Sequence, residues 1–523
     1  MATAMLDMQV HPNKRDVNAA PLAHHKKPTP PWSWLPSSLA KDAKAGFCNP
    51  WPSWHKPTNE EVWNSLQWGD DDDPCIDLAV RHLPQDEGKT FVGGPVSQNL
   101  SQNLSWNRPN FDLESNPPSS NAARAARLLK IEQADLDFNP TSPSVGAKTT
   151  WLGHAGVLVQ LPPPSTDRGV RPLRCLFDPI FSMRCSPNQF VGPLRSYPPP
   201  CAVEDLPPID VVFISHNHYD HLDYDTISKI WMHNKATVRF FVPLGNKRTL
   251  ASWDIPEDRI AELDWWESAD MTPRGAFRKG SLKIWCTPAQ HNSGRLGRDT
   301  EADATLWSSW YLENQTPNEP PYRVFFAGDT GYQFHGSPDW PPSPNNPSPN
   351  IEEKYPCCPA FEEIKVRLGA PHLLLLPVSV GATYAYLRSF NPLPESMNPI
   401  PRHRPGLTGA AHMPPWDAVR VLKVMAGKEG HVDEVSTSTR ARPEDSDAKN
   451  RPDTVAIAIH WGTFVTDPVD VLKTLGEVEF ACQQQGVRFA RSSSCMKEDN
   501  GSKQGADRRL YFLALNHGQG VYT

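Results

Sequence analysis

A short run of metal-type side chains directly after an apolar segment constrains this sequence more than any other feature. Residues 211–214, Val-Val-Phe-Ile, have the pattern of a buried strand, and residues 215–223 then read Ser-His-Asn-His-Tyr-Asp-His-Leu-Asp. Side chains alternate along an extended chain, so the first two histidines point to the same side. Imidazole nitrogens and carboxylate oxygens are ligands that divalent transition metals take. Four ligands can therefore converge from one turn: His216, His218, Asp220 and His221.

Three later apolar segments, each rich in β-forming residues, also end close to a metal-type residue. Functional side chains gather where loops converge over the ends of a rigid sheet, so we expect these residues to meet the histidine motif. The segments and their ligands are 282–287 with His291, 324–327 with Asp329, and 455–459 with His460.

Seven ligands are too many for one tetrahedral site and suit two metal ions. The natural division places His216, His218 and His291 on one ion and Asp220, His221 and His460 on the other. Asp329 would bridge them, because a carboxylate has two oxygens to share. Metals bridged in this way lie about 3.5–4 Å apart and lower the pKa of a water between them, which gives a nucleophile at neutral pH. The sequence therefore predicts a two-metal hydrolase, with Zn²⁺ expected and iron or manganese as alternatives.

Composition divides the 523 residues unevenly. Apolar content is 38%, and the 56 prolines are about twice the usual share, so long irregular segments are expected. We expect a disordered tail over 1–45, an aromatic arm and linker packing on the catalytic domain over 46–147, and a catalytic domain over 148–523. Mobile insertions are expected near 335–359 and 429–453. The tryptophans of 46–70 alternatively form an aromatic foot for membrane or acyl chains.

Charge and cysteine usage restrict partners and compartment. The net charge of −7 argues against a general nucleic-acid binder. The ten cysteines form no Cys-x-x-Cys pair and the N-terminus lacks a secretory pattern, which favours reduced thiols inside the cell. No apolar run reaches the about 18 residues of a membrane span. We expect a cytoplasmic protein with peripheral membrane contact; the alternative is a mitochondrial presequence, which Asp7 and Asp16 weaken.

The histidine motif and the later strand-end ligands resemble the metallo-β-lactamase superfamily. This resemblance implies an α/β fold, an αββα four-layer sandwich with the site at one edge. Other blocks are similar to the N-acyl-phosphatidylethanolamine-hydrolysing phospholipase D family, such as Asn-Pro-Trp-Pro-Ser-Trp at 49–54 and Thr-Trp-Leu-Gly-His at 150–154. Further blocks lie at 178–181, 186–193, 206–210, 263–267, 326–332, 359–364 and 458–464. The resemblance covers most of 46–64 and 148–470.

That family resemblance implies chemistry and partners. The seven residues match di-zinc ligands, and the activity is hydrolysis of N-acyl-phosphatidylethanolamine to N-acylethanolamine and phosphatidic acid. His412 matches a histidine beside the substrate phosphate, and we expect Asp220 and His412 to be catalytic. A phospholipid substrate, peripheral membrane contact and a homodimer are also implied. The chain departs from the family at Ala411, where the family has glutamine, and in the segments 335–359 and 378–411.

Two other functions and several second-rank residues stay open. A metal-bound hydroxide attacks carbonyl carbon as readily as phosphorus, so an ester or lactone hydrolase of the same superfamily is the alternative. A non-enzymatic membrane scaffold would predict lost ligands, and all seven are present. Asp178 either holds the far nitrogen of a ligand histidine or caps a turn. His154 either packs or functions. The remaining candidates, interpreted as structural or solvent-exposed, are His233, His335, His372 and His403.

Overall fold

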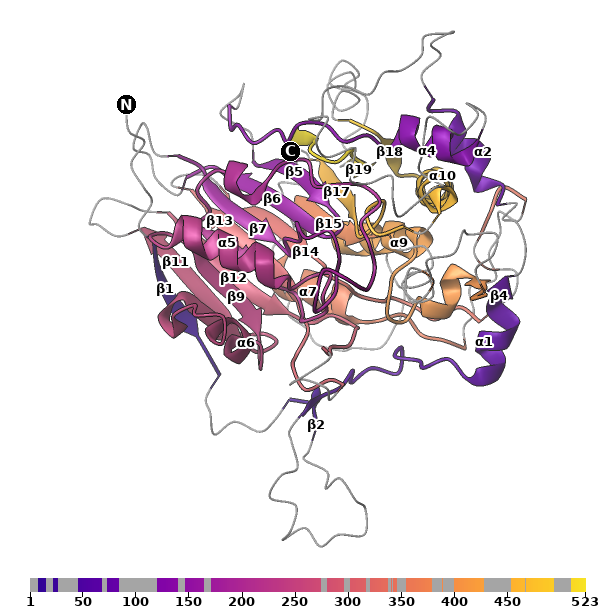
Figure 1. Ribbon diagram of the computed structural model, residues 1–523. Helices are drawn as coiled ribbons and strands as arrows, with labels where there is room; N and C mark the ends of the chain where they lie inside the picture. Colours follow the sequence, from indigo (N-terminus) through magenta and orange to yellow (C-terminus); the bar gives the residue numbers. More distant parts are fainter. Residues whose placement is uncertain are drawn as a thin grey trace, which may run out of the picture.

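Two β-sheets stacked face to face form the centre of the protein in the computed structural model, and helices cover their outer faces (Figure 1). This arrangement confirms the predicted αββα sandwich. The structure describes residues 8–15, 22–26, 46–67, 73–83, 120–139, 146–163, 171–273, 280–295, 302–316, 320–336, 340, 342–345, 354–378, 388, 399–427, 453–465, 467–492 and 509–523.

The larger sheet has nine strands, and it is mixed: its first part is antiparallel and its second part is parallel. In spatial order the strands are β1 (Met8–Asn13), β11 (Ser268–Pro273), β12 (Ser281–Thr287), β13 (Ser309–Gln315), β14 (Tyr322–Phe326), β15 (Leu373–Pro377), β17 (Thr454–Ile459), β19 (Leu510–Leu513) and β18 (Arg488–Ala490).

The smaller sheet has seven strands and ends on the last residues of the chain. In spatial order they are β10 (Ile260–Leu263), β9 (Arg239–Pro243), β8 (Val211–Phe213), β7 (Leu173–Phe177), β6 (Gly156–Leu161), β5 (Lys148–Gly153) and β20 (Gly520–Tyr522). Two small pairs lie outside the sheets: β2 (His25–Lys26) with β3 (Gly46–Phe47), and β4 (Leu66–Gln67) with β16 (Arg402–His403).

The helices begin and end where the sequence supplies caps. Thr58 and Glu61 form a capping box at α1, Pro415 and Pro468 stand at the first positions of α9 and α10, and Gly427 and Gly486 end these two helices in the left-handed region. The bounds are α1 (Asn59–Ser65), α2 (Cys75–Val80), α4 (Asn121–Leu128), α5 (Tyr224–Asn234), α6 (Lys247–Ala251), α7 (Ala360–Leu368), α9 (Pro415–Ala426) and α10 (Pro468–Gln485), with 3-10 turns at Val203–Asp205, Glu257–Arg259 and Pro405–Thr408.

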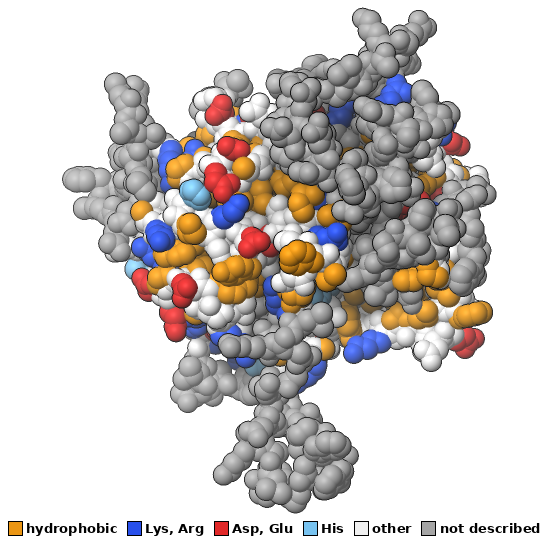
Figure 2. Space-filling model, in the orientation of Figure 1, with side chains coloured by type: hydrophobic (Ala, Val, Ile, Leu, Met, Phe, Trp, Pro, Cys, Tyr) orange, Lys and Arg blue, Asp and Glu red, His pale blue; other side chains and the backbone are white. Residues whose placement is uncertain are grey.

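Apolar side chains fill the space between the sheets and beneath each helical layer. Across the central layer, the ring of Phe177 lies 4.7 Å from that of Phe326, and Phe213 lies 5.5 Å from Trp310. A second cluster joins the outer face of the seven-stranded sheet to α5, through side chains such as Ile227. The face that carries α5 and α6 mixes acidic, basic and apolar side chains (Figure 2). The two sheets are thus held rigidly, so residues at their strand ends have fixed positions.

The N-terminal region departs from the expected disordered tail. β1 pairs antiparallel with β11, from Met8 opposite Pro273 to Asn13 opposite Ser268, and β2 pairs with β3. The expectation is therefore wrong for 8–15 and 22–26. β1 covers the edge of β11 and becomes the outermost strand of the sheet, and its local sequence gives no signal of this pairing. The rest of 1–45 lies outside the described residues.

The predicted insertions have different outcomes. In 335–359, Trp340 is buried and stacks on His335 with 3.9 Å between ring centroids, so this part packs on the domain and is not a free surface loop. His335 is also hydrogen-bonded to Asp417, which fits the structural role expected for it. Residues 429–452 lie outside the described residues. None of the described helices combines the length and apolar character needed to cross a membrane.

Candidate metal centre

The histidine motif lies in the loop between β8 and α5, at the carboxyl end of β8. His291 follows β12, Asp329 follows β14 and His460 follows β17 directly. The structure brings all seven predicted ligands to this edge of the two sheets. Three residues here have left-handed backbones, namely His154, Asp178 and His460 with φ of 51°, 34° and 60°. Such conformations cost about 1–3 kcal/mol each and gather at functional sites.

The first group contains His216, His218 and His291. The Nε2 atom of His216 lies 2.8 Å from Nδ1 of His218, and Nε2 of His291 lies 3.4 Å from the same Nδ1. These three ring nitrogens form a set that could hold one metal ion. Burial lowers the pKa of His216 and His291 well below the usual value, so both imidazoles are neutral and available as ligands at neutral pH.

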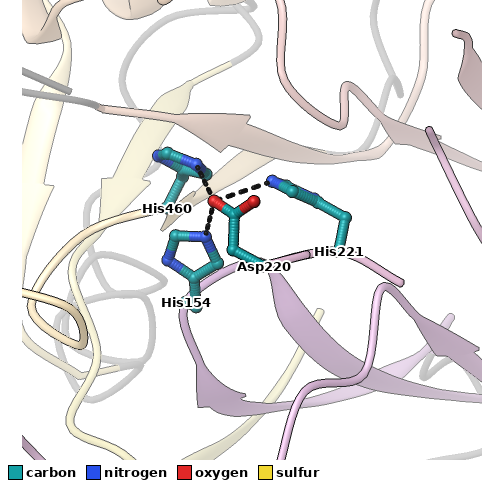
Figure 3. A group of neighbouring side chains, drawn as sticks. All are labelled: His154, Asp220, His221 and His460. Atoms are coloured by element: carbon teal, nitrogen blue, oxygen red, sulfur yellow. Dashed lines mark hydrogen bonds and ion pairs between the residues drawn. The ribbon is translucent and has the colours of Figure 1, made fainter. Parts of the chain in front are cut away.

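The second group surrounds the carboxylate of Asp220. His460 and His221 each place Nε2 3.6 Å from Asp220 Oδ2 (Figure 3). Burial opposes a positive charge on these histidines, but the carboxylates of Asp329 and Asp220 outweigh it. They raise the pKa of His460 to about 9 and the pKa of His221 well above its usual value. The group thus attracts positive charge, which is the condition for a cation site.

Asp329 lies between the two groups. Its Oδ2 is 3.1 Å from Nε2 of both His221 and His460, 3.7 Å from Nε2 of His291 and 4.0 Å from Nε2 of His216. Its Oδ1 is buried and forms no hydrogen bond with a described residue. A buried carboxylate oxygen without a donor is costly, and a cation would satisfy it. The donor set therefore fits two metal ions that share this carboxylate.

His154 lies beside the second group, which favours the functional alternative over simple packing. It lies in the turn between β5 and β6, and its Nε2 is 3.0 Å from Asp220 Oδ2 (Figure 3). Burial, then the neighbouring His460, lowers its pKa to about 3. A neutral imidazole at this position can donate an N–H to Asp220 and hold that carboxylate in one orientation. The geometry also counts His154 among four donors that could hold a metal.

Asp178 supports the loop behind the ligands. Its Oδ2 is 2.7 Å from Nδ1 of His221, and its Oδ1 accepts the backbone N–H of Ser215 at 2.7 Å. The Ser215 hydroxyl donates to Asp178 and lies 2.9 Å from Nδ1 of His216. Ligand histidines usually need such a partner on the far nitrogen. The geometry thus places Asp178 behind a ligand histidine, as the first of its two predicted roles requires.

His412 reaches the same edge from the segment before α9. Its Nδ1 is 3.7 Å from Asp329 Oδ2, and its ring lies 4.9 Å from that of His291. Burial lowers its pKa to about 4. The backbone carbonyl of Ala411 is 2.9 Å from Nδ1 of His291, so this segment also orients a ligand. A close approach fixes it there, because a Cβ on Gly331 would lie 1.9 Å from the carbonyl oxygen of Ala410.

The segment 49–54 makes contacts that the sequence interpretation missed. The Asn49 side chain donates to the carbonyl of His291 at 2.7 Å and accepts its N–H at 3.2 Å. Ser53 bonds to the side chain of Gln290, and Trp51 stacks on Trp265 with 5.4 Å between centroids. The block at 49–54 was visible in the sequence as a family block, but nothing in it pointed to His291, which lies 242 residues away.

Replacing Asn49 by alanine should lower hydrolysis and metal retention about tenfold, at the lower end of the range for groups that orient metal ligands. Both hydrogen bonds to the His291 backbone would be lost, so the imidazole would lose its fixed position. The check is the steady-state rate, with metal content measured on the same protein. The exposed Asn59→Ala on the same arm is the control, and equal losses in both variants would contradict a specific role for Asn49.

The beta-lactamase superfamily domain matches residues 173–336, from β7 past Asp329. Fold and strand-end donors thus define a protein of the metallo-β-lactamase class. The chain is also 39% identical to N-acyl-phosphatidylethanolamine-hydrolyzing phospholipase D 1 of Caenorhabditis elegans over 349 residues, which are 65% of this chain and 71% of that protein. The chain belongs to the N-acyl-phosphatidylethanolamine-hydrolysing phospholipase D family.

Other relatives match shorter segments. The yeast Saccharomyces cerevisiae protein described as N-acyl-phosphatidylethanolamine-hydrolyzing phospholipase D, mitochondrial, is 36% identical over 160 residues, 31% of each chain. An uncharacterised Mycobacterium tuberculosis protein is 42% identical over 184 residues, 35% of this chain and 42% of that protein, so the match spans less than half of this relative. Among solved structures, CmlA, a diiron β-hydroxylase from Streptomyces venezuelae, aligns with TM-score 0.32 at 16% identity, covering 71% of this chain and 54% of that one. A putative metal-dependent hydrolase from Parabacteroides distasonis aligns with TM-score 0.31 at 12% identity, covering 71% and 94%.

Proposed function

We propose that the protein is a zinc-dependent phosphodiesterase that hydrolyses N-acyl-phosphatidylethanolamine to N-acylethanolamine and phosphatidic acid. The observation that carries the proposal is the pair of donor groups on either side of Asp329, in a chain of this family. When bound, two divalent cations would supply Lewis acidity and would lower the pKa of water at the site, so that a nucleophile would be available at neutral pH.

The residues at the site have separate proposed roles. His216, His218 and His291 would hold one cation, and Asp220, His221 and His460 the other, with Asp329 shared between them. His154 and Asp178 stand behind Asp220 and His221 and keep these two side chains in place.

His412 is the candidate that meets the substrate. Its side chain is 15% exposed, whereas those of His221 and His291 are fully buried, so it can contact a molecule entering the site. As a neutral imidazole with its pKa near 4, it can donate a hydrogen bond to a phosphoryl oxygen at neutral pH. We therefore propose His412 as the catalytic residue that contacts the substrate phosphoryl group, and Asp220, a ligand of the second cation, as the other catalytic residue.

The decisive experiment compares substrates on one preparation of the full chain. Purified protein is given vesicles containing N-acyl-phosphatidylethanolamine, and in parallel a panel of carboxyl esters and lactones. The proposal expects release of N-acylethanolamine at a rate far above that for the panel. Turnover of lactones without phosphodiester cleavage would replace it by the ester or lactone hydrolase alternative.

A rigid loop beside the site supports contact with a lipid surface. Phe190 is 91% exposed and Val191 is 60% exposed, although their backbone N–H groups are both held by the side chain of Asn188. At the base of the loop, the N–H of Ser182 donates to Asp223, two residues past His221. Two adjacent apolar side chains held out by an ordered loop suit insertion into a bilayer interface.

Replacing Phe190 by serine should therefore reduce turnover of vesicle substrate about tenfold and leave turnover of a short-chain, monomeric substrate unchanged. The reason is the loss of about 1.5 kcal/mol or more of apolar transfer energy. Vesicle co-sedimentation measures the binding directly. Val366→Ser, at another exposed apolar side chain, serves as the control. Equal vesicle rates for wild type and Phe190→Ser would exclude this loop as the contact.

A further inference from the structure

A second cluster of metal-type side chains lies outside the centre described above. His24 and His25 come from the N-terminal segment 22–26, and Asp264 follows β10 at the start of the turn into β11. The Nε2 atom of His24 is 2.7 Å from Oδ1 of Asp264, and Nε2 of His25 is 2.8 Å from Oδ2. Each imidazole thus contacts a different oxygen of the same carboxylate, although the two histidines are some 240 residues from the aspartate in the sequence.

The backbone holds each of these donors in place. The carbonyl of His24 accepts the N–H of Cys48 at 2.9 Å, and the N–H of His25 donates to Leu22 at 3.0 Å. Asp264 Oδ1 also accepts the N–H of Trp265 at 2.8 Å, and the N–H of Asp264 donates to the carboxylate of Glu267. The cluster is therefore built by ordered chain on both sides and is not a chance meeting of mobile side chains.

Burial and charge favour a cation at this position. His24 is 3% exposed and Asp264 is 5% exposed, whereas His25 is half-buried and leaves one open side. Glu267, also buried, brings a second carboxylate to the turn. Burial lowers the pKa of His24, against the hydrogen bond to Asp264, so its imidazole is neutral and can present a ring nitrogen.

The donor atoms of His24, His25 and Asp264 all lie within 4.8 Å of one another. Tetrahedral zinc with ligand distances of about 2.0–2.1 Å needs donors about 3.3 Å apart. Each imidazole nitrogen now lies 2.7–2.8 Å from its carboxylate oxygen and would have to draw back from that oxygen by about half an ångström. Two histidines and one carboxylate, with a water in the fourth position, are an ordinary open zinc set.

We propose that His24, His25 and Asp264 form a further metal site, which takes one divalent transition-metal cation of the zinc type and holds the segment 22–26 against the β10–β11 turn. A series of contacts links this site to the first centre. His24 packs on Trp265 at 4.1 Å, Trp265 donates to the carbonyl of Trp307, and Trp307 donates to the carbonyl of Ala289, two residues before His291. The site does not depend on the proposed substrate.

The test counts metal on the full chain. Metal-stripped protein is titrated with Zn²⁺ against a chromophoric indicator, and bound zinc is then measured by elemental analysis after gel filtration. We expect one equivalent more in wild type than in His25→Gln, which keeps a polar side chain at a half-exposed position. The control is His55→Gln, because His55 lies outside the cluster and pairs with Glu61 at 2.8 Å. It should keep the wild-type count.

This outcome can be told apart from a failure of the first centre, because the test compares the zinc counts of His25→Gln and His55→Gln, and both variants keep that centre. Asp329→Asn should lower the count at the first centre and still lose one further equivalent when combined with His25→Gln. A second measurement uses the wild type alone. Zinc should slow tryptic cleavage after Lys26, because the bound cation would hold the segment 22–26 in place. Equal zinc counts in wild type and His25→Gln would overturn the proposal and leave a hydrogen-bonded clasp in its place, and so would cleavage that zinc does not slow.

Discussion

Replacing Asp329 by asparagine should abolish hydrolysis, with a loss of about a thousandfold or more, and should release metal from the first centre. A single Asp329 oxygen lies within 3.1–4.0 Å of four ligand histidines, and its other oxygen has no hydrogen-bond partner among the described residues. Asparagine keeps the shape but has one carbonyl oxygen and no charge, so it cannot be shared between two cations. A metal contributes several kcal/mol of transition-state stabilisation, and 1.36 kcal/mol is about tenfold in rate.

The measurement is a steady-state rate on vesicle substrate together with metal content. Asp225→Asn is a matched control, since Asp225 lies just after the histidine motif in the first turn of α5 and is exposed. That variant should keep both rate and metal. Wild-type turnover by Asp329→Asn would refute the two-metal assignment.

Asp178→Asn should lower activity and metal affinity about 10–100-fold, the range found when a ligand histidine loses its far partner. Asp178 accepts from His221 and from the backbone of Ser215, one on each oxygen. An amide has one acceptor oxygen, so its NH₂ group would face one of these donors. A buried donor left without an acceptor costs about 1–3 kcal/mol, and the free energy of unfolding should fall by that amount.

Backbone strain does not complicate this prediction, because asparagine adopts the left-handed region at least as readily as aspartate. Asp254→Asn is the control: Asp254 also has a positive φ of 62°, but it is exposed. It should leave activity, metal affinity and unfolding unchanged. An Asp178→Asn protein with wild-type zinc affinity would show that Asp178 only caps its turn.

Local pattern was enough to predict the strands that carry the ligands. The segments 211–214, 282–287, 324–327 and 455–459 each match a strand within two residues at either end. Each of these strands is a continuous or alternating apolar run followed by polar residues, and such a signal is contained in a few neighbouring positions. For the same reason the sandwich and the edge at which the ligands meet could be predicted.

Contacts between distant segments could not be predicted in this way. His154 meets Asp220 across 66 residues, Asn49 meets His291 across 242, and β1 pairs with β11 across some 260. Neither partner carries a local signal of the other. The sequence therefore leaves the role of His154 open, predicts aromatic packing or an aromatic foot for residues 46–70, and predicts disorder for the first 45 residues. The domain boundaries, the homodimer and the compartment stay predictions.

The pairing of β20 with β5 has a consequence for biosynthesis. Tyr522 lies opposite Lys148 and Gly520 opposite Thr150, so the two strands that pair at this edge are separated by some 370 residues in the sequence. His460 must also emerge before the second donor group exists. Pairings between distant segments form slowly. β5 therefore has to wait for some 370 further residues before β20 can pair with it, and the second donor group is complete only once residue 460 has been synthesised.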